Sequence, residues 1–366
     1  MKDLAQVDIT VCIVNWNTTQ LLHNCLNSIY SNPWRASLQV IVVDNHSDDD
    51  SVAMVKRDFP DVQLIANVDN VGFSKANNQA FKLASGRYIL MLNSDTLVQP
   101  GAFDTMMDFM DQHLEAGAMG CKLLNADGTL QRSCWRGFPS LRMAAVDAFY
   151  LWKWASNWSW VRGVEISKEE LQQTIQVDHL LGACILARRE TVEQIGGMDE
   201  SVFLFFEETE WCHRMRQCGW KIYYSPTAEI IHLGQQSANL NPERNLPEKY
   251  HNYEWFFQKC MEPSLLQQGV LRAVFVTAGV IRIGLWEWRG RNPVRREFAK
   301  RMIAGYRKVV KQSVGLSHPA SPTSKPPSNP STANATQPPV TGSSAYSDSK
   351  SNNKDIHVNQ AQLPSL

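Results

Sequence analysis

The chain has 366 residues, of which 43% are hydrophobic and 20% charged, so it can build a sizeable core and about two domains. Lysine and arginine number 36, as do aspartate and glutamate, so no net basic charge points to a nucleic-acid partner. The eight cysteines include no Cys-x-x-Cys pair, which argues against a zinc ribbon and indicates core thiols in a reducing, cytoplasmic compartment. The first apolar run, 9–14, is too short for a secretory leader.

The first hundred residues alternate between expected strands and helices. Strands are expected at 9–14, 38–43, 62–65 and 88–92, with helices at about 21–29, 50–59 and 74–84. Further strands are expected at 118–124, 180–187, 223–226 and 229–232, with a tryptophan-rich stretch at 152–160. The alternation predicts an α/β fold with a mixed, mostly parallel sheet and flanking helices.

Polar residues follow several of these strands. Asn15 follows the first strand, Asp44 the second, and Asn93 and Asp95 the fourth. Ligands of open α/β sheets bind beyond the carboxyl ends of the strands. The pattern therefore predicts a ligand site at this edge.

The sequence changes character after about residue 240. Helices are expected at 248–261 and 264–288, and the second is apolar but interrupted by charges that argue against a membrane span. The stretch 289–311 then holds nine basic residues and one acid. The final part is rich in Ser, Pro, Asn and Thr and is expected to be disordered. Three regions follow: an α/β domain at 1–240, a helical basic extension at 241–316 and a tail at 317–366.

Two acids at strand ends are candidates for ligand binding. Asp95 stands where a carboxylate can hold Mg²⁺ or Mn²⁺ against a diphosphate, because these cations prefer oxygen ligands and leave positions open for phosphates. Asp44 can accept a hydrogen bond from a nucleobase or a ribose hydroxyl. Taken singly, each acid is equally typical of a residue that caps a turn.

Three more segments admit two readings each. The run 203–210, Phe-Leu-Phe-Phe-Glu-Glu-Thr-Glu, is typical of carboxylates with raised pKa values acting as general bases, or of acids favoured by a helix dipole. His232 ends an apolar run and suits either a metal or a core hydrogen bond. Residues 70–78 open a helix whose first amides suit a phosphate or ribose, or simply a capped helix start.

In their order along the chain, these segments resemble the inverting family 2 glycosyltransferases of GT-A fold, particularly the rhamnosyltransferase-like members. The resemblance covers about residues 8–240. It rests on the segments 14–17, 42–45, 70–78, 92–95, 131–133, 138–140, 182–183, 195–200 and 203–210. Asn93 replaces the first aspartate of the usual metal motif, and Glu207-Glu208 stands where Glu-Asp is typical. Lys75 and Ala76 stand where glycines are usual.

The resemblance implies a Rossmann-like, nucleotide-sugar-binding domain and assigns a role to each matching residue on the donor side. Asp44 would contact the nucleobase, while Asn15 and Asn77 would help to hold the nucleotide. Asp95 would ligate a divalent cation, Mg²⁺ or Mn²⁺, with His232 as the second ligand.

On the acceptor side, the resemblance implies a catalytic base. Glu208 aligns with that base and Glu207 is its neighbour. Because glutamate is one methylene longer than the usual aspartate, Glu210 also remains a candidate.

The implied function is the inverting transfer of a sugar, with rhamnose as one candidate, from a nucleoside-diphosphate sugar to a hydroxyl of a glycan or lipid-linked acceptor in cell-surface polysaccharide synthesis. Two alternatives stay open: a non-catalytic nucleotide-sugar-binding protein of the same fold, and a sugar nucleotidyltransferase. The second would normally carry a Gly-rich basic loop, whereas residues 14–22 hold no Gly, Lys or Arg. The apolar 264–288 and basic 289–311 segments predict peripheral attachment to the anionic inner face of the cytoplasmic membrane.

Overall fold

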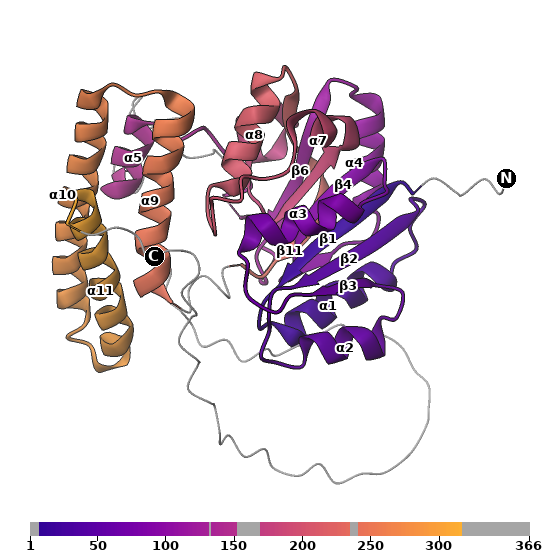
Figure 1. Cartoon of the computed structure of the whole chain (residues 1–366), viewed down its shortest axis with the longest axis horizontal. Coiled ribbons are helices and arrows are strands. Elements are labelled where there is room, and N and C mark those ends of the chain that lie inside the picture. Colours follow the sequence, from indigo (N-terminus) through magenta and orange to yellow (C-terminus); the bar gives the residue numbers. More distant parts are fainter. Residues whose placement is uncertain (1–6, 132, 152–168, 235–240, 317–366) are drawn as a thin grey trace, which may run out of the picture. The chain divides into compact units, whose positions relative to one another are not determined.

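The computed structural model describes residues 7–131, 133–151, 169–234 and 241–316 (Figure 1). The tryptophan-rich stretch at 152–160 and the tail at 317–366 lie outside these ranges, so what the sequence predicts for them stays a prediction.

A mixed sheet forms the centre of the described structure. Its strands run in the order β3 (Gln63–Ala66), β2 (Leu38–Asp44), β1 (Ile9–Asn15), β4 (Tyr88–Asn93), β10 (Cys184–Arg188), β6 (Ala116–Leu124), β11 (Lys221–His232) and β5 (Thr96–Val98), and β8 (Ile175–Gln176) pairs with β11. The first four strands are mutually parallel and β11 is parallel to β6, whereas β10, β5 and β8 run antiparallel to their neighbours. The predicted α/β fold with a mostly parallel sheet is confirmed.

Helices cover both faces of this sheet. They are α1 (Thr19–Tyr30), α2 (Ser51–Asp58), α3 (Phe73–Leu83), α4 (Ala102–Gln112), α7 (Arg189–Ile195) and α8 (Glu207–Gln217). In Figure 1, α1 and α2 lie on one side of β1–β3 and α3 lies on the other. The apolar residues of α1 recur at helical spacing and are buried, which explains why it forms there. On the opposite face, Phe81 of α3 stacks on Trp211 of α8.

The central parallel strands are buried on both sides, unlike β3 at the edge of the sheet. Ile9, Val11 and Ile13 of β1 have no exposed surface, and Ile41 to Val43 of β2 have none either. Such strands read as continuous β-branched runs, which is the pattern that predicted them.

Two expectations for strands differ from the structure. The strand expected at 180–187 is divided into His179–Leu180, which pairs outside the main sheet, and β10 (Cys184–Arg188) within it. The sequence predicts two short strands at 223–226 and 229–232, but the structure has the single strand β11, whose register against β6 shifts between Ser225 and Glu229. Pro226 lies in the shifted stretch and has no N–H to donate to the ladder, so the strand continues past it through a bulge.

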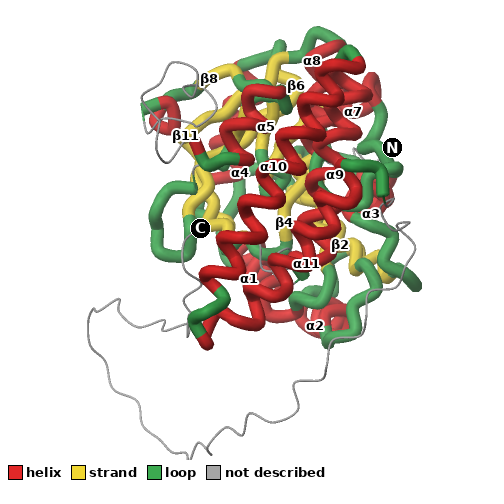
Figure 2. The backbone as a smooth tube through the Cα atoms, turned by 90° about the vertical axis from the view of Figure 1, so that its left-hand side faces the viewer, coloured by secondary structure: helices red, strands yellow, loops and turns green. Residues whose placement is uncertain are grey.

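The residues after 240 form three long helices with their own hydrophobic clusters. They are α9 (Pro242–Met261), α10 (Leu265–Arg289) and α11 (Arg296–Ser313), and Figure 2 shows them as neighbours. Helix α5 (Leu141–Ala148) packs on α10. The sequence reading took 289–311 only as a basic stretch, whereas most of it forms α11, because Ala299, Met302 and Tyr306 recur at helical spacing and are buried.

Short elements complete the described chain. The strands β7 (Trp135–Arg136) and β9 (His179–Leu180) pair with each other, and two 3₁₀ turns lie at Glu170–Gln172 and Pro293–Arg295. All eight cysteines are free thiols, as predicted, and six of them are buried. Cys218 is exposed and Cys260 is half-buried, so these two do not fit the expectation of core thiols.

Candidate active site

The ends of β1 and β2 form a closed hydrogen-bonded corner. Asn15 and Asp44 are register partners, and Asn15 Nδ2 donates to Asp44 Oδ2 at 2.9 Å. Ser47 donates its backbone N–H to Oδ1 of the same carboxylate at 2.9 Å and its hydroxyl to Oδ2 at 2.6 Å. The Asn15 Oδ1 accepts from the Thr18 hydroxyl at 2.6 Å. The structure thus brings together Asn15 and Asp44, two of the residues predicted to bind the nucleotide. Both are buried, and both form several hydrogen bonds.

Asn77, the third residue predicted to bind the nucleotide, lies on α3. Its Nδ2 donates to the Phe73 carbonyl at 3.0 Å, while its buried Oδ1 has no partner among the described residues. Asn45 links the corner to the start of this helix, because its Nδ2 donates to the Gly72 carbonyl at 3.2 Å. No direct hydrogen bond between Asn77 and the Asn15–Asp44 pair is present in the described part of the chain.

Asp95 and His232 face each other across the pairing of β5 with β11. The Asp95 Oδ1 lies 3.3 Å from His232 Nε2, and the two side chains are only 14% and 7% exposed. Gln131 accepts at Oε1 from His232 Nδ1 at 3.0 Å and donates Nε2 to the His232 carbonyl at 2.6 Å. With Nδ1 as the donor to Gln131, Nε2 is the ring nitrogen that faces Asp95.

This pair fits a divalent cation. A carboxylate oxygen and an imidazole nitrogen stand together, and the second ring nitrogen is oriented by Gln131, which is the usual arrangement behind a metal-ligating histidine. Across the described ranges no group of three or more His, Cys, Asp or Glu side chains is placed to hold a metal ion, so the protein itself offers only this pair here. The role of Gln131 was not predicted, although it lies in the segment 131–133 that carries the resemblance.

The acidic run begins α8 at the same edge of the sheet. A Cβ placed on Gly182 would lie 3.5 Å from Glu208 Cγ, so this glycine leaves room for the glutamate. Next to it, the Ala183 carbonyl accepts from the Asn93 backbone N–H at 3.0 Å. Asn93 ends β4, two residues before Asp95. Glu208 therefore lies at the same edge of the sheet as the Asp95–His232 pair.

At the start of α8, Glu207 is buried and Glu208 is half-buried, and each has one buried carboxyl oxygen. Burial raises the pKa of Glu208 to about 7. Burial, and then the neighbouring Glu208 carboxylate, holds the pKa of Glu207 well above its ordinary value. One carboxyl oxygen of each is buried and accepts no hydrogen bond from the described residues. A carboxyl group with a pKa near 7 can exchange a proton at neutral pH.

Residues 5–246 match a family model described as glycosyltransferase like family 2. The chain belongs to glycosyltransferase family 2. It is 27% identical over 231 residues to an N-acetylglucosaminyl-diphospho-decaprenol L-rhamnosyltransferase of Mycobacterium tuberculosis (strain H37Rv), covering 60% of this chain and 74% of that protein. It is 24% identical to the rhamnosyltransferase WbbL of Escherichia coli (strain K12), covering 51% of this chain and 75% of that protein.

A solved structure shares the fold of this family 2 glycosyltransferase. It is the mannosyltransferase PcManGT from Pyrobaculum calidifontis in complex with GDP-Man and Mn²⁺, with a TM-score of 0.51 and 14% identity. The match covers 86% of this chain and 88% of that one. The predicted GT-A type of fold is thereby confirmed.

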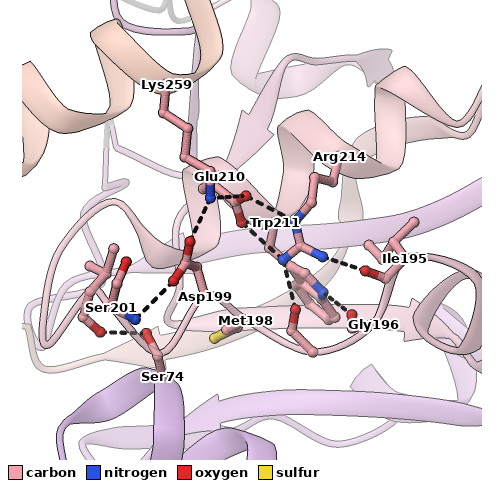
Figure 3. A network of polar contacts seen from close by, with 12 residues as sticks. Ser74, Ile195, Gly196, Met198, Asp199, Ser201, Glu210, Trp211, Arg214 and Lys259 are labelled. Carbon is pink, nitrogen blue, oxygen red and sulfur yellow. Dashed lines mark hydrogen bonds and ion pairs between the residues drawn. The ribbon is translucent and has the colours of Figure 1, made fainter.

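The third acid of the run, Glu210, is committed to ion pairs (Figure 3). Arg214 Nε donates to both of its carboxylate oxygens at 2.9 Å, and Lys259 Nζ lies 3.0 Å from Oε1. The Glu210 side chain is 2% exposed. Lys259 also pairs with Asp199, and Arg214 donates to the Ile195 and Gly197 carbonyls, so the network ties α8 to the preceding loop and to α9. This geometry favours a structural role for Glu210 and leaves Glu207 and Glu208 as candidate bases.

Proposed function

We propose that this family 2 glycosyltransferase is an inverting enzyme that moves a sugar, with rhamnose as the first candidate, from a nucleoside-diphosphate sugar to a hydroxyl of a glycan or lipid-linked acceptor. Both named curated relatives are rhamnosyltransferases, and the mycobacterial one is named for a diphospho-decaprenol acceptor. Cell-surface polysaccharide synthesis is the proposed setting. The observation that carries the proposal is Glu208, which has a buried carboxyl oxygen without a partner among the described residues and lies beside Gly182, at the edge of the sheet where Asp95 and His232 stand.

The proposed reaction is a single displacement. The Glu208 carboxylate takes the proton of the acceptor hydroxyl, and the acceptor oxygen forms a bond to the anomeric carbon. The bond from that carbon to the diphosphate oxygen breaks, and the nucleoside diphosphate leaves with the electron pair. Attack from the face opposite the leaving group inverts the configuration.

The remaining site residues would hold the donor. Asp44, Asn15 and Asn77 are proposed to position the nucleoside, and the free Oδ1 of Asn77 is available as an acceptor. Asp95 and His232 would hold Mg²⁺ or Mn²⁺. When bound, the cation would neutralise charge on the diphosphate as a Lewis acid.

The direct test is turnover. The full chain is incubated with Mn²⁺, a panel of nucleotide-sugars and a polyprenyl-diphosphate-linked sugar acceptor, and released nucleoside diphosphate is measured. We expect release with one donor, dependent on the acceptor. Saturable nucleotide-sugar binding without release would instead favour the non-catalytic alternative.

We also propose that the chain attaches peripherally to an anionic membrane through its last two helices. By length and composition alone α10 could cross a membrane, which for one helix is weak evidence, and only 28% of its apolar window is buried. Its exposed apolar residues recur at helical spacing and form one stripe: Leu266, Val270, Val280, Ile281, Leu285 and Trp288.

The two arginines that interrupt the apolar sequence of α10 both contact other parts of the protein. Arg272 pairs with Glu254 of α9, and Arg282 donates to the Tyr306 hydroxyl at 2.7 Å and the Asp147 carbonyl at 2.8 Å. The third charge, Glu287, is exposed and lies 3.8 Å from Arg307 of α11, so the stripe itself is apolar but has one carboxylate next to Trp288. The following segment exposes a row of cations: Arg291, Arg295, Arg296, Lys300, Arg301, Arg307, Lys308 and Lys311. An apolar stripe beside exposed basic residues suits anionic lipid, at about 1 kcal/mol for each basic residue near the surface.

Vesicle sedimentation tests this attachment. The chain should pellet with vesicles of phosphatidylglycerol and phosphatidylcholine, more weakly at high salt, and not with phosphatidylcholine alone. The double variant Ile281→Glu/Trp288→Glu should stay in solution. Leu114→Glu, which charges an exposed leucine outside α10, should pellet like the wild type. Failure of the wild type to pellet would refute the proposal.

A further inference from the structure

The segment that leads into α8 has an unusual backbone. Phe205 and Phe206 have φ angles of 71° and 72°, and Phe206 is the residue immediately before α8. Left-handed φ values cost a residue with a Cβ roughly 1–2 kcal/mol each, and two consecutive phenylalanines there are rare. Such a turn persists only when its surroundings hold it.

A side chain of α9 holds this turn. Asn252 is 6% exposed, and its Nδ2 donates to the Leu204 carbonyl at 2.8 Å and to the Phe205 carbonyl at 3.3 Å. Both hydrogen-bond donors of one amide thus engage successive carbonyls of the turn. The Phe206 ring also packs edge-on against Tyr253, the next residue of α9.

The other side of the turn is attached to the donor-side helix. The Phe203 carbonyl accepts from the Phe73 backbone N–H at 2.8 Å, at the first residue of α3. A Cβ on Gly72 would come within 2.8 Å of the Phe203 ring, so the contact needs glycine there. The turn is therefore held between α3 and α9. Because α8 begins immediately after it, the backbone conformation of the turn determines the position of the first residues of α8.

We propose that Asn252 is a positioning residue for the catalytic base. By holding Phe205 and Phe206 in the left-handed conformation, it keeps the carboxyl group of Glu208 beside Gly182 and near the end of β4. The inference rests on the proposed role of Glu208. It also gives the C-terminal extension a part in the reaction, because the family match ends at residue 246 and Asn252 lies beyond it.

The test is the variant Asn252→Ala, with Asn252→Asp as a variant of nearly the same volume that lacks the two donors. A base displaced by about 1 Å can cost about 100-fold in rate. We expect kcat to fall about 10- to 100-fold in both variants, while the affinity for nucleoside diphosphate with Mn²⁺, measured by titration calorimetry, stays within about twofold.

A matched control and a rescue separate positioning from general stability. Tyr253→Phe removes a hydrogen bond of the same helix that goes to Ser140 rather than to the turn, and should keep the wild-type kcat. Phe205→Gly introduces a residue that takes positive φ without a steric penalty. Added to Asn252→Ala, it should restore at least part of the lost kcat.

The outcomes are distinct. Wild-type kcat in Asn252→Ala, alongside an inactive Glu208→Gln, overturns the inference and leaves the proposed base standing. A loss in Asn252→Ala that affects kcat and nucleotide affinity equally, without rescue by Phe205→Gly, also overturns it. An active Glu208→Gln refutes the proposed base instead, together with the inference that rests on it.

Discussion

Two regions of this protein bury carboxyl oxygens but differ in how the hydrogen bonds of those oxygens are satisfied. At the corner of β1 and β2, the Asp44 carboxylate receives hydrogen bonds from Asn15 and from the backbone and hydroxyl of Ser47. At the start of α8, Glu207 and Glu208 each keep a buried oxygen without a partner in the described structure. A satisfied buried group stabilises a fold, whereas an unsatisfied one costs about 1–3 kcal/mol.

This difference indicates a structural part for the corner of β1 and β2 and a chemical part for the start of α8. The corner shapes the edge of the sheet and supplies the Asp44 carboxylate with hydrogen-bond donors. The start of α8 keeps a carboxyl group poorly solvated, which raises its pKa to about 7 and destabilises the folded state above that pH. A protein tolerates such a loss of stability where the group is needed for activity. Substitutions at the start of α8 should therefore mainly lower kcat, whereas substitutions in the corner should mainly lower stability.

The largest effect is expected from Glu208→Gln. It removes the proposed proton acceptor and keeps the volume, so kcat should fall roughly 10²–10⁴-fold, the usual range for a general base. Donor affinity should change little. The wild-type kcat/KM should rise with pH through about 7, as the raised pKa of Glu208 requires, and this limb should vanish in the variant. Initial-rate kinetics from pH 5 to 9 measure both.

Stability provides the control for this variant. A folded-state pKa raised above the unfolded value gives stability that is lost as pH rises toward 7, so removing the carboxyl group should not lower Tm at pH 8. Glu210→Gln should do the reverse, keeping kcat while lowering Tm, because it weakens pairs with Arg214 and Lys259. If Glu207→Gln or Glu210→Gln is inactive and Glu208→Gln is not, the base is assigned to the wrong glutamate.

A smaller loss of rate is expected from Asp95→Ala. The variant removes one of two proposed cation ligands, and several kcal/mol of charge stabilisation correspond to a fall in kcat of about 100-fold or more. Mn²⁺-dependent binding of nucleoside diphosphate should weaken, while the circular dichroism spectrum stays unchanged. Wild-type activity in excess chelator would contradict the proposed cation.

The smallest effect on turnover is expected in the corner. Asp44→Ala leaves the Ser47 amide and the Asn15 side chain without their acceptor, so the free energy of unfolding should fall by about 3 kcal/mol. Denaturant unfolding measures this loss. At a temperature where the variant is folded, kcat should stay within about tenfold of the wild type, while KM for the nucleotide-sugar should rise because Asp44 is proposed to position the nucleoside. A stable variant with strongly reduced kcat would place chemistry at the corner and remove the contrast.

Local sequence patterns were sufficient for the sheet edge. The β-branched runs of β1, β2 and β4 are followed at once by polar residues, and parallel strands bring their carboxyl ends to one edge. Asn15 and Asp44 were therefore predictable neighbours. The distant pair Asp95 and His232 was paired through the family resemblance, since nothing local in the sequence joins the two residues.

Other features could not be read from the chain. The bulge in β11 and the helix α11 were missed because they depend on other elements: β11 pairs with β6, and α11 packs on α9 and α10. Gln131 orients His232 from 101 residues away, and Asn252 reaches the turn before α8 from 47 and 48 residues away. No local pattern marks such an asparagine, because its surroundings come from other segments.

By itself, the sequence determined the α/β class, the ligand edge of the sheet and an acidic run fit for acid–base chemistry, because these depend on residue types at short spacing. Only the tertiary structure decided how the three acids of that run differ. Glu210 forms ion pairs with Arg214 of its own helix and with Lys259 of α9, whereas Glu208 lies beside Gly182 with one buried oxygen that has no partner among the described residues. The physical reason is that desolvation and pairing, which set the chemistry of a carboxyl group, are supplied by residues distant in the chain.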